Sequence, residues 1–207
     1  MAYVAPSVTA DPAIPSETNT ALAAVNAFVT TLYTDAIAAM SVVREFIRLS
    51  TGRQLLMADI DAQGAVLGSP GNTDPTVAAS PVTQAQANTA YSSLTGYIDT
   101  FTGRFATIFG TMRSAMQLVG GHIQERTDID AGTITLLTAT AAITMASDPV
   151  TMAHMNTGLT TATAAVDTVN TRLLVLLRQL RTDFRVGLGN PINMGGLDGT
   201  IAVIAAH

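Results

Sequence analysis

The chain has 207 residues, of which 48% are hydrophobic and only 12% are charged, against about 25% charged residues in a typical soluble domain. This length and apolar content suffice to bury a substantial core in one domain. The net charge of −5, with arginine as the only basic residue besides histidine, excludes a surface built to neutralise phosphates and so argues against nucleic-acid binding. The absence of cysteine excludes disulfides and thiol chemistry.

Residues 1–10 form an N-terminal arm. Its opening residues, Met-Ala-Tyr-Val-Ala-Pro, lack the basic and apolar regions of a signal peptide. The longest apolar runs, such as 173–177 and the threonine-diluted stretch 134–145, are too short to span a bilayer. We therefore expect a protein made in the cytoplasm, without a membrane span, and its final location stays unassigned.

The first long helix is predicted within residues 11–79. Asp11-Pro12 has the pattern of a helix N-cap followed by proline in the first turn, but Pro15 follows, so Ser16 and Glu17 mark the expected start of regular helix. Apolar residues then recur in steps of three and four, which predicts about 35 helical residues, or roughly 50 Å. They are Leu22, Val25, Val29, Leu32, Ala36, Ala39, Val43 and Phe46.

A turn rich in aspartate follows this helix. Asp59-x-Asp61-x-Gln63-Gly64 has the opening spacing of a calcium-binding loop, but the twelfth position, where a bidentate glutamate belongs, is Pro70. The pattern returns in shortened form at Asp128-x-Asp130. We expect no metal site and interpret these aspartates as residues that bond their own turns. The four calcium candidates are Asp59, Asp61, Asp128 and Asp130.

The second long helix is predicted within residues 80–147, with Ser80-Pro81 as its start. Its apolar residues alternate steps of four and three without a break, and Gly96, Gly103 and Gly110 each weaken it by about 1 kcal/mol relative to alanine. These glycines indicate close contact with a neighbour, or a local break near Gly103. The apolar stripe comprises Ala87, Tyr91, Leu94, Ile98, Phe101, Phe105, Ile108, Met112, Ala115 and Val119.

The third long helix is predicted within residues 148–207, after Asp148-Pro149. Its apolar stripe comprises Met152, Met155, Leu159, Ala162, Val166, Val169, Leu173, Leu176 and Leu180. Beside the three stripes, Asp35 occupies the position that Arg104 and Arg172 hold in the other helices. One hypothesis is an Asp35–arginine contact between helices, and the alternative is three independently solvated side chains.

Short apolar pieces close the three units. They lie at 65–67, 133–145 and 200–205, where alternating threonine and apolar residues favour short strands; for 133–146 a short helix fits almost as well. The stretch 64–79, rich in glycine and proline, is predicted to be a loop.

The chain also repeats itself, at spacings of 69 and then 68 residues. Seven positions match in all three segments, where about one match would be expected by chance in so alanine- and threonine-rich a chain. They are Pro12/Pro81/Pro149, Asn19/Asn88/Asn156, Thr20/Thr89/Thr157, Thr31/Thr100/Thr168, Arg44/Arg113/Arg181, Gly52/Gly121/Gly189 and Asp61/Asp130/Asp198. We divide the chain into repeats 11–79, 80–147 and 148–207.

The predicted fold is mainly α: three long heptad-patterned helices in an elongated bundle, built from three tandem repeats of about 69 residues with irregular connections. The shared glycines lie where helix C-caps are expected. An up-and-down arrangement is favoured over a parallel one because it needs less backbone to connect the helices.

No catalytic pattern accompanies this architecture. His122, His154 and His207 are far apart in sequence, glutamate occurs only three times, and nucleophile-elbow and phosphate-loop motifs are missing. We therefore expect no enzyme and no cofactor, and predict a structural subunit that self-assembles or binds neighbouring subunits, such as a virion component of a phage capsid, neck or tail. The alternative is a helical module that holds a small apolar ligand or a metal ion between its helices.

Overall fold

A computed structural model describes residues 3–51, 61–62, 73–120, 130–131, 133, 135–136, 138–187 and 195–207. Three long helices dominate this part of the chain: α1 (Pro15–Thr51), α3 (Gln84–Gly120) and α5 (Met152–Gly187), with 37, 37 and 36 residues. A fourth, α6 (Gly195–Ala205), has 11 residues. The described residues contain no strand, so the predicted mainly α class is confirmed.

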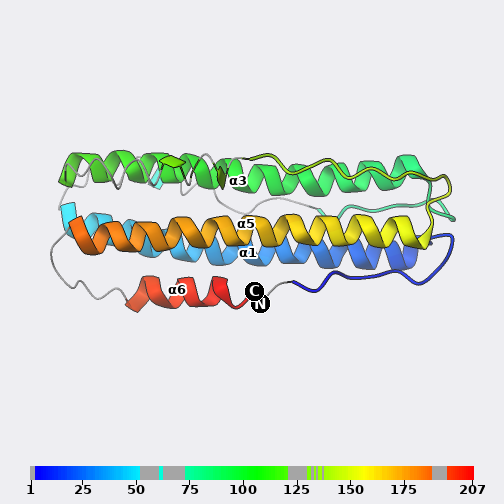
Figure 1. Ribbon diagram of the computed structural model, residues 1–207, viewed down its shortest axis with the longest axis horizontal. Helices are drawn as coiled ribbons and strands as arrows, with labels where there is room; N and C mark the ends of the chain where they lie inside the picture. The colour runs from blue at the N-terminus through cyan, green and yellow to red at the C-terminus, as the bar shows by residue number, and fades with distance from the viewer. Residues whose placement is uncertain are drawn as a thin grey trace.

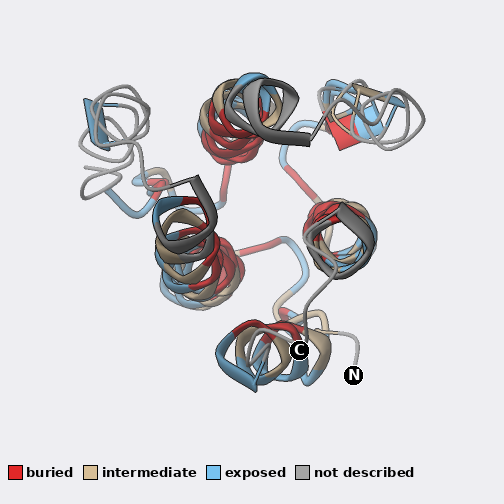
Figure 2. Cartoon of the chain, turned by 90° about the vertical axis from the view of Figure 1, so that its left-hand side faces the viewer, coloured by how far each residue is buried: buried red, intermediate tan, exposed pale blue. Residues whose placement is uncertain are grey.

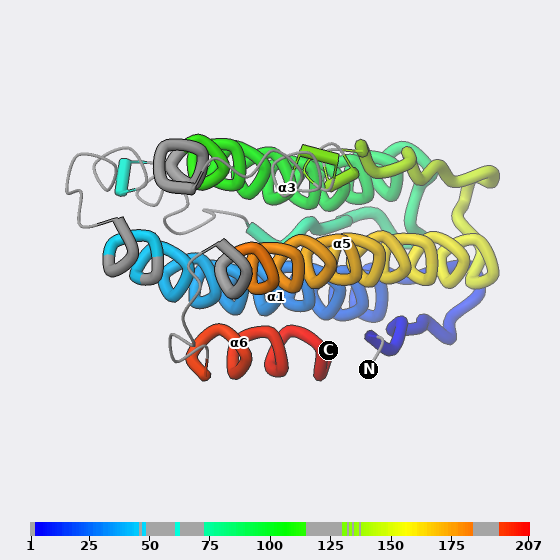
Figure 3. The backbone as a smooth tube through the Cα atoms, turned by 60° about the vertical axis from the view of Figure 1, so that its left-hand side comes forward, coloured from blue at the N-terminus to red at the C-terminus, as the bar shows by residue number. Residues whose placement is uncertain are grey.

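The three long helices are parallel: each begins at the same end of the elongated bundle and ends at the other (Figure 1). The predicted up-and-down arrangement is therefore wrong. Its premise was that connections should be short, but the chain runs back along the bundle after each long helix. α6 makes such a return, antiparallel to α1 and α5 and in contact with both (Figures 1 and 3).

The predicted apolar stripes face one another in the middle of the bundle. Every described side chain of the three stripes is buried except the partly buried Met152. Seen end-on in Figure 2, the buried faces of the long helices point inward and the exposed faces outward. Tyr33, Phe101 and Phe105 form an aromatic cluster at mid-length, with ring centroids 4.6–5.6 Å apart. Each such side chain stabilises the fold by about 1.5–3 kcal/mol through burial alone.

Extended segments, here called straps, precede the three long helices and lie along the bundle (Figure 3). They are the N-terminal strap (3–14), the second strap (73–83) and the third strap (138–151). Each strap is held by an asparagine near the start of a long helix. Asn156 of α5 holds the N-terminal strap, Asn19 of α1 holds the second strap, and Asn88 of α3 holds the third. These amides accept the backbone N–H of Val8, Val77 and Met145 at 2.7–2.8 Å, which explains why asparagine recurs there.

The straps meet where the long helices begin. The backbone N–H of Ala13 donates to the carbonyl of Val150, that of Val150 to Val82, and that of Val82 to Ala13, each at 2.9 Å. This closed ring of three hydrogen bonds relates residues at the spacing of 69 and 68, and all three side chains are fully buried. The ring fixes the three helix starts against one another.

Pro81 and Pro149 do not occupy the first helical turns, contrary to the sequence prediction, whereas Pro12 precedes its helix as expected. Pro12, Pro81 and Pro149 follow cis peptide bonds and lie three residues before the helices begin. The preceding aspartates accept hydrogen bonds from the helix of another unit: Asp11 from the N–H of Met152, and Asp148 from that of Gln84, each at 3.3 Å. An aspartate before proline can cap its own helix or accept an N–H from the start of another helix, and a free helix N–H is satisfied in both cases. The sequence pattern therefore could not distinguish the two arrangements.

The predicted strands are also corrected. Residues 200–205 are the second half of α6, which buries Leu197, Ile201 and Ile204, spaced by four and three. In the stretch 133–146, residues 133, 135 and 136 are helical and 138–146 belong to the extended third strap. The piece at 65–67 and the glycines Gly52, Gly121 and Gly189 lie outside the described residues.

Candidate assembly surface

The outward faces of the long helices carry a second periodic pattern, which we call the outer stripes. At seven matched levels, each helix presents an uncharged residue, and all of these are small except Val175; all are exposed except the partly buried Ala23 and Gly103. The stripes are Ser16, Thr20, Ala23, Ala27, Thr31, Thr34 and Ala38 on α1; Ala85, Thr89, Ser92, Gly96, Thr100, Gly103 and Thr107 on α3; and Ala153, Thr157, Thr160, Ala164, Thr168, Thr171 and Val175 on α5. At 1.5 Å per residue, each stripe is roughly 33 Å long.

The threonine hydroxyls of these stripes are bonded within their own helices. Eight of them donate to the carbonyl four residues earlier, at 2.8–3.0 Å. A neighbouring protein that covered these threonines would therefore leave no unpaired donor, which normally costs about 1–3 kcal/mol. The outer stripes can thus be buried at low polar cost although they are rich in hydroxyls.

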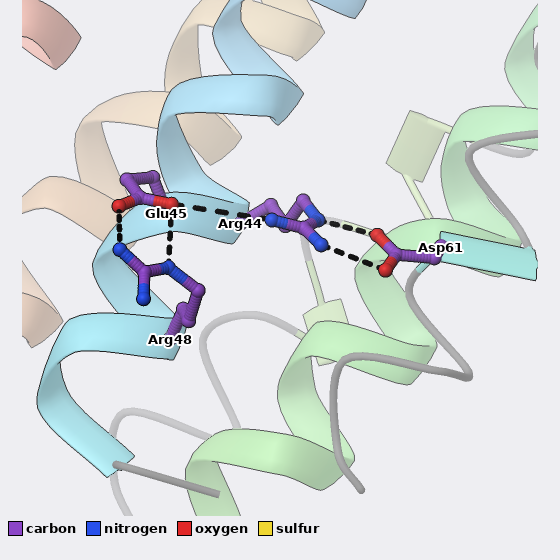
Figure 4. Close-up of polar contacts among 4 residues, drawn as sticks. All are labelled: Arg44, Glu45, Arg48 and Asp61. Atoms are coloured by element: carbon purple, nitrogen blue, oxygen red, sulfur yellow. Dashed lines mark hydrogen bonds and ion pairs between the residues drawn. The ribbon is translucent and has the colours of Figure 1, made fainter. Parts of the chain in front are cut away.

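Three matched ion pairs lie near the C-terminal ends of the long helices. Arg44, Arg113 and Arg181 each pair with an aspartate 17 residues later, and these partners are Asp61, Asp130 and Asp198. Figure 4 shows the first pair, in which the Nε and Nη2 of Arg44 both donate to the Asp61 carboxylate, beside the Glu45–Arg48 pair. The hydrogen bonds from Arg44 lower the pKa of the Asp61 carboxyl below its usual range. Two of the positions shared by all three segments are thereby partners of each other.

The calcium candidates divide between these pairs and the part of the chain that is not described. Asp61 and Asp130 bind arginines, and Asp59 and Asp128 lie outside the described residues. Within the described ranges, no group of three or more histidine or acidic side chains is placed to hold a metal ion.

Two of the three histidines lie in the described chain. The Nδ1 of His154 is 2.8 Å from the Oγ of Ser147 and 3.0 Å from the Oγ1 of Thr151. At the matched position of the first segment, Glu17 accepts the N–H groups of Thr9 and Ala10, and Gln86 does the same in the second. His154 therefore joins its strap to its helix as Glu17 and Gln86 do, although a serine–histidine contact alone has the spacing of a nucleophile and base.

The hypothesised Asp35–arginine contact is replaced by others. Asp35 contacts His207, Arg104 donates to the hydroxyl of Tyr33, and Arg172 donates to the carbonyl of Thr138. These side chains therefore join α1 to the C-terminal end of α6, α3 to α1, and α5 to the third strap.

A groove of about 360 Å³ opens between the N-terminal strap and α1, lined by Pro6, Ser7 and Thr9 on one side and by Glu17 and Thr20 among others on the other. Backbone hydrogen bonds from the strap lower the pKa of Glu17 below its usual 4.5, so an ionised carboxylate borders this space. An open, charged groove differs from the enclosed apolar pocket that a carrier of apolar ligands needs.

The sequence analysis predicted neither the outer stripes nor a segment of α1 that is long and apolar enough to cross a membrane. Thr20/Thr89/Thr157 and Thr31/Thr100/Thr168 were visible as shared positions, and both sets lie in the stripes. The segment Pro15–Glu45 is long and apolar enough to cross a membrane by length and composition, which the search for unbroken apolar runs did not detect. In the bundle, 44% of its most apolar window is buried, and core helices of soluble proteins pass the same test.

Comparison of the chain with protein-family models, with curated proteins and with solved structures found no significant match.

Proposed function

We propose that the protein is a non-enzymatic structural subunit of a larger protein assembly, and that neighbouring subunits pack on its outer stripes. The observation that carries this proposal is the set of 21 uncharged residues, 20 of them small, displayed at matched levels on three parallel helices. Interface centres are depleted of charge, and small residues let helices approach closely. A freely diffusing monomer is usually kept apart from its copies by a more highly charged surface.

The matched contacts support a finer proposal, that the chain consists of three tandem copies of one unit with heptad-packed helices. The asparagine clamps, the ring of backbone hydrogen bonds and the arginine–aspartate pairs all recur at spacings of 69 and 68. Such a chain offers three similar faces to its neighbours, as a trimer would. A virion component, such as a phage capsid, neck or tail subunit, is the setting that we propose for it.

Native mass spectrometry together with electron microscopy tests this function. The wild-type protein is expected to form particles or oligomers that bury more than about 2,000 Å² per contact. Replacing Thr31, Thr100 and Thr168 together with arginine should disperse these assemblies and leave the circular dichroism spectrum unchanged, because the side chains are exposed.

A matched control introduces the same charge on the straps. Ser7, Thr76 and Thr144 occupy equivalent exposed positions there, and their replacement with arginine should leave assembly intact. A wild-type protein that stays monomeric at high concentration, or a stripe variant that assembles as well as the strap control, would contradict the proposal.

A further inference from the structure

The three straps differ in one respect. The second strap follows α1 in the chain and lies on α1, and the third follows α3 and lies on α3. The N-terminal strap lies on α5, from which α1 and α3 separate it in the sequence. The ring of three units is therefore closed by backbone at two junctions and by non-covalent contacts at the third.

The contacts at the non-covalent junction match those at a continuous one. The N–H of Tyr3 donates to the carboxylate of Asp167 at 3.0 Å, and the N–H of Thr140 donates to that of Asp99 at 2.9 Å. Under the repeat spacing, Tyr3 corresponds to Thr140 and Asp167 corresponds to Asp99. At the same place, His207 of the α6 end stacks on Tyr3, with ring centroids 5.5 Å apart. The residues that correspond to His207 and Tyr3 at the junction between α3 and α5, Ala139 and Thr140, are joined by a peptide bond.

Few buried groups hold the N-terminal strap. Val8 and Ala13 are its fully buried side chains, and its polar contacts with α5 come from Tyr3, Val8 and Asp11. Tyr3 is partly covered, since it stacks on Phe28 at 4.5 Å, and burial together with Asp35 and Asp167 raises its pKa to about 12. The strap is therefore specific in its placement but carries only a small part of the core.

We propose that the N-terminal strap exchanges between copies of this chain, so that residues 3–14 of one copy dock on α5 of a second copy. The strap has partners on α5 and also on α1, where Glu17 accepts hydrogen bonds from Thr9 and Ala10 and Phe28 stacks on Tyr3. A second copy offers both sets of partners in the same geometry, so an exchanged strap regains what it loses. The second and third straps cannot exchange in this way, because each is followed and preceded by helices of the same bundle. This inference rests on the proposed function, since copies meet at high local concentration only in an assembly, and it names a second copy as the partner.

Cysteine cross-linking tests the exchange, because the natural chain has no cysteine to interfere. One variant carries Val4→Cys on the strap, where the side chain is 83% exposed, and a second carries Ala164→Cys on the exposed face of α5, one turn before Asp167. The two full-length proteins are tagged differently, mixed at high concentration, incubated and treated with a flexible bismaleimide. A parallel mixture pairs Val4→Cys with Thr107→Cys, an equally exposed position on α3.

Exchange predicts roughly tenfold more cross-linked heterodimer in the Val4/Ala164 mixture than in the Val4/Thr107 mixture, because docking raises the effective concentration of the matched pair. The control is a single chain that carries both Val4→Cys and Ala164→Cys. If the bismaleimide closes a loop within this chain, it is long enough to join the two positions. If that loop forms and the two mixtures give equal heterodimer, the exchange is refuted. Particles that assemble without strap cross-links would refute the exchange alone, whereas cross-links between copies that form no larger assembly would refute the proposed function alone.

Discussion

The inner and outer faces of the same three helices follow the same steps of three and four, but they use different residues. The inner face holds mainly large apolar residues such as leucine, valine, phenylalanine and tyrosine and is buried, whereas the outer face holds serine, threonine, alanine and glycine, with Val175 as the one larger residue, and is mostly exposed. Both faces are almost free of charge. The difference shows that the same periodicity can mark a buried face and an exposed one, and that residue size separates the two in this molecule. Under the proposed function, the exposed face of small residues is the one that meets neighbouring subunits.

The largest expected effect comes from a charge placed on the inner face. Replacing Phe105 with aspartate puts a carboxylate where the ring is fully buried against Tyr33 and Phe101, so we expect a loss of more than about 4 kcal/mol in unfolding free energy, or no folding. Thr107→Asp, two residues away on the outer stripe, should cost less than about 1 kcal/mol. Urea unfolding followed by circular dichroism separates the two, and equal losses would remove the distinction between the faces.

A smaller effect is expected at Gly158, a glycine on the inner face. A Cβ there would lie 2.7 Å from the ring of Tyr91, which is buried and donates its hydroxyl to the carbonyl of Met155 at 3.0 Å. We expect Gly158→Ala to destabilise the fold by about 1–3 kcal/mol through overpacking. Thermal unfolding of the variant and of the wild-type protein measures this loss of stability.

The repeat register supplies the control for that change. The positions matched to Gly158 hold Ala21 and Ala90, and those matched to Tyr91 hold Leu22 and Leu159, so the largest side chain coincides with the smallest partner. The double change of Tyr91→Leu with Gly158→Ala should therefore lose less stability than the sum of the single changes. Strictly additive losses would show that the two positions do not compensate.

Gly103, on the outer face, should respond in the opposite direction. A Cβ there meets nothing within 4 Å, so Gly103→Ala is expected to stabilise α3 by about 1 kcal/mol through helix propensity. If a neighbouring helix approaches this stripe closely, the same change weakens assembly while it raises the melting temperature. A lower melting temperature would contradict the open space beside Gly103.

The bundle's core could be read from the sequence because the apolar spacing specifies helices and their buried faces without knowledge of the connections. The parallel arrangement could not, since it depends on straps held by Asn19, Asn88 and Asn156, and a lone asparagine in a helix has no characteristic pattern. The strand predicted at 200–205 was wrong because four residues of alternation outweighed the helical spacing of Leu197, Ile201 and Ile204.

The candidate surface was only partly visible in the sequence. Two sets of shared threonines belonged to it, but a stripe of small residues stands out as a face only when the opposite face is known to be buried. The shared arginines and aspartates were noticed separately, and their pairing depends on where the chain turns after each helix. Contacts that join a helix to its own connection are therefore the part of this molecule that local sequence patterns predict least.

The aspartates at the charged ends should matter little for stability. Replacing Asp61 and Asp130 together with asparagine removes two partly exposed ion pairs, which water screens strongly and which therefore contribute little to stability. We expect a small decrease in melting temperature that is the same with and without calcium. A large calcium-dependent stabilisation of the wild-type protein that the double variant lacks would restore the calcium interpretation of these turns.

The smallest expected effect is a change in acid sensitivity at the strap. The pKa of Glu17 is lowered by the hydrogen bonds from Thr9 and Ala10, so its contribution to stability is present above its ordinary pKa of 4.5 and is lost as the pH falls through the lower folded value. Gln86 makes the equivalent contacts without a charge, so Glu17→Gln should keep the strap in place near neutral pH. Melting temperatures measured from pH 6 downward should then decline less steeply below about pH 4.5 in the variant than in the wild-type protein. Identical acid profiles would mean that Glu17 titrates alike in the folded and unfolded chain, and that the strap is not held through its carboxylate.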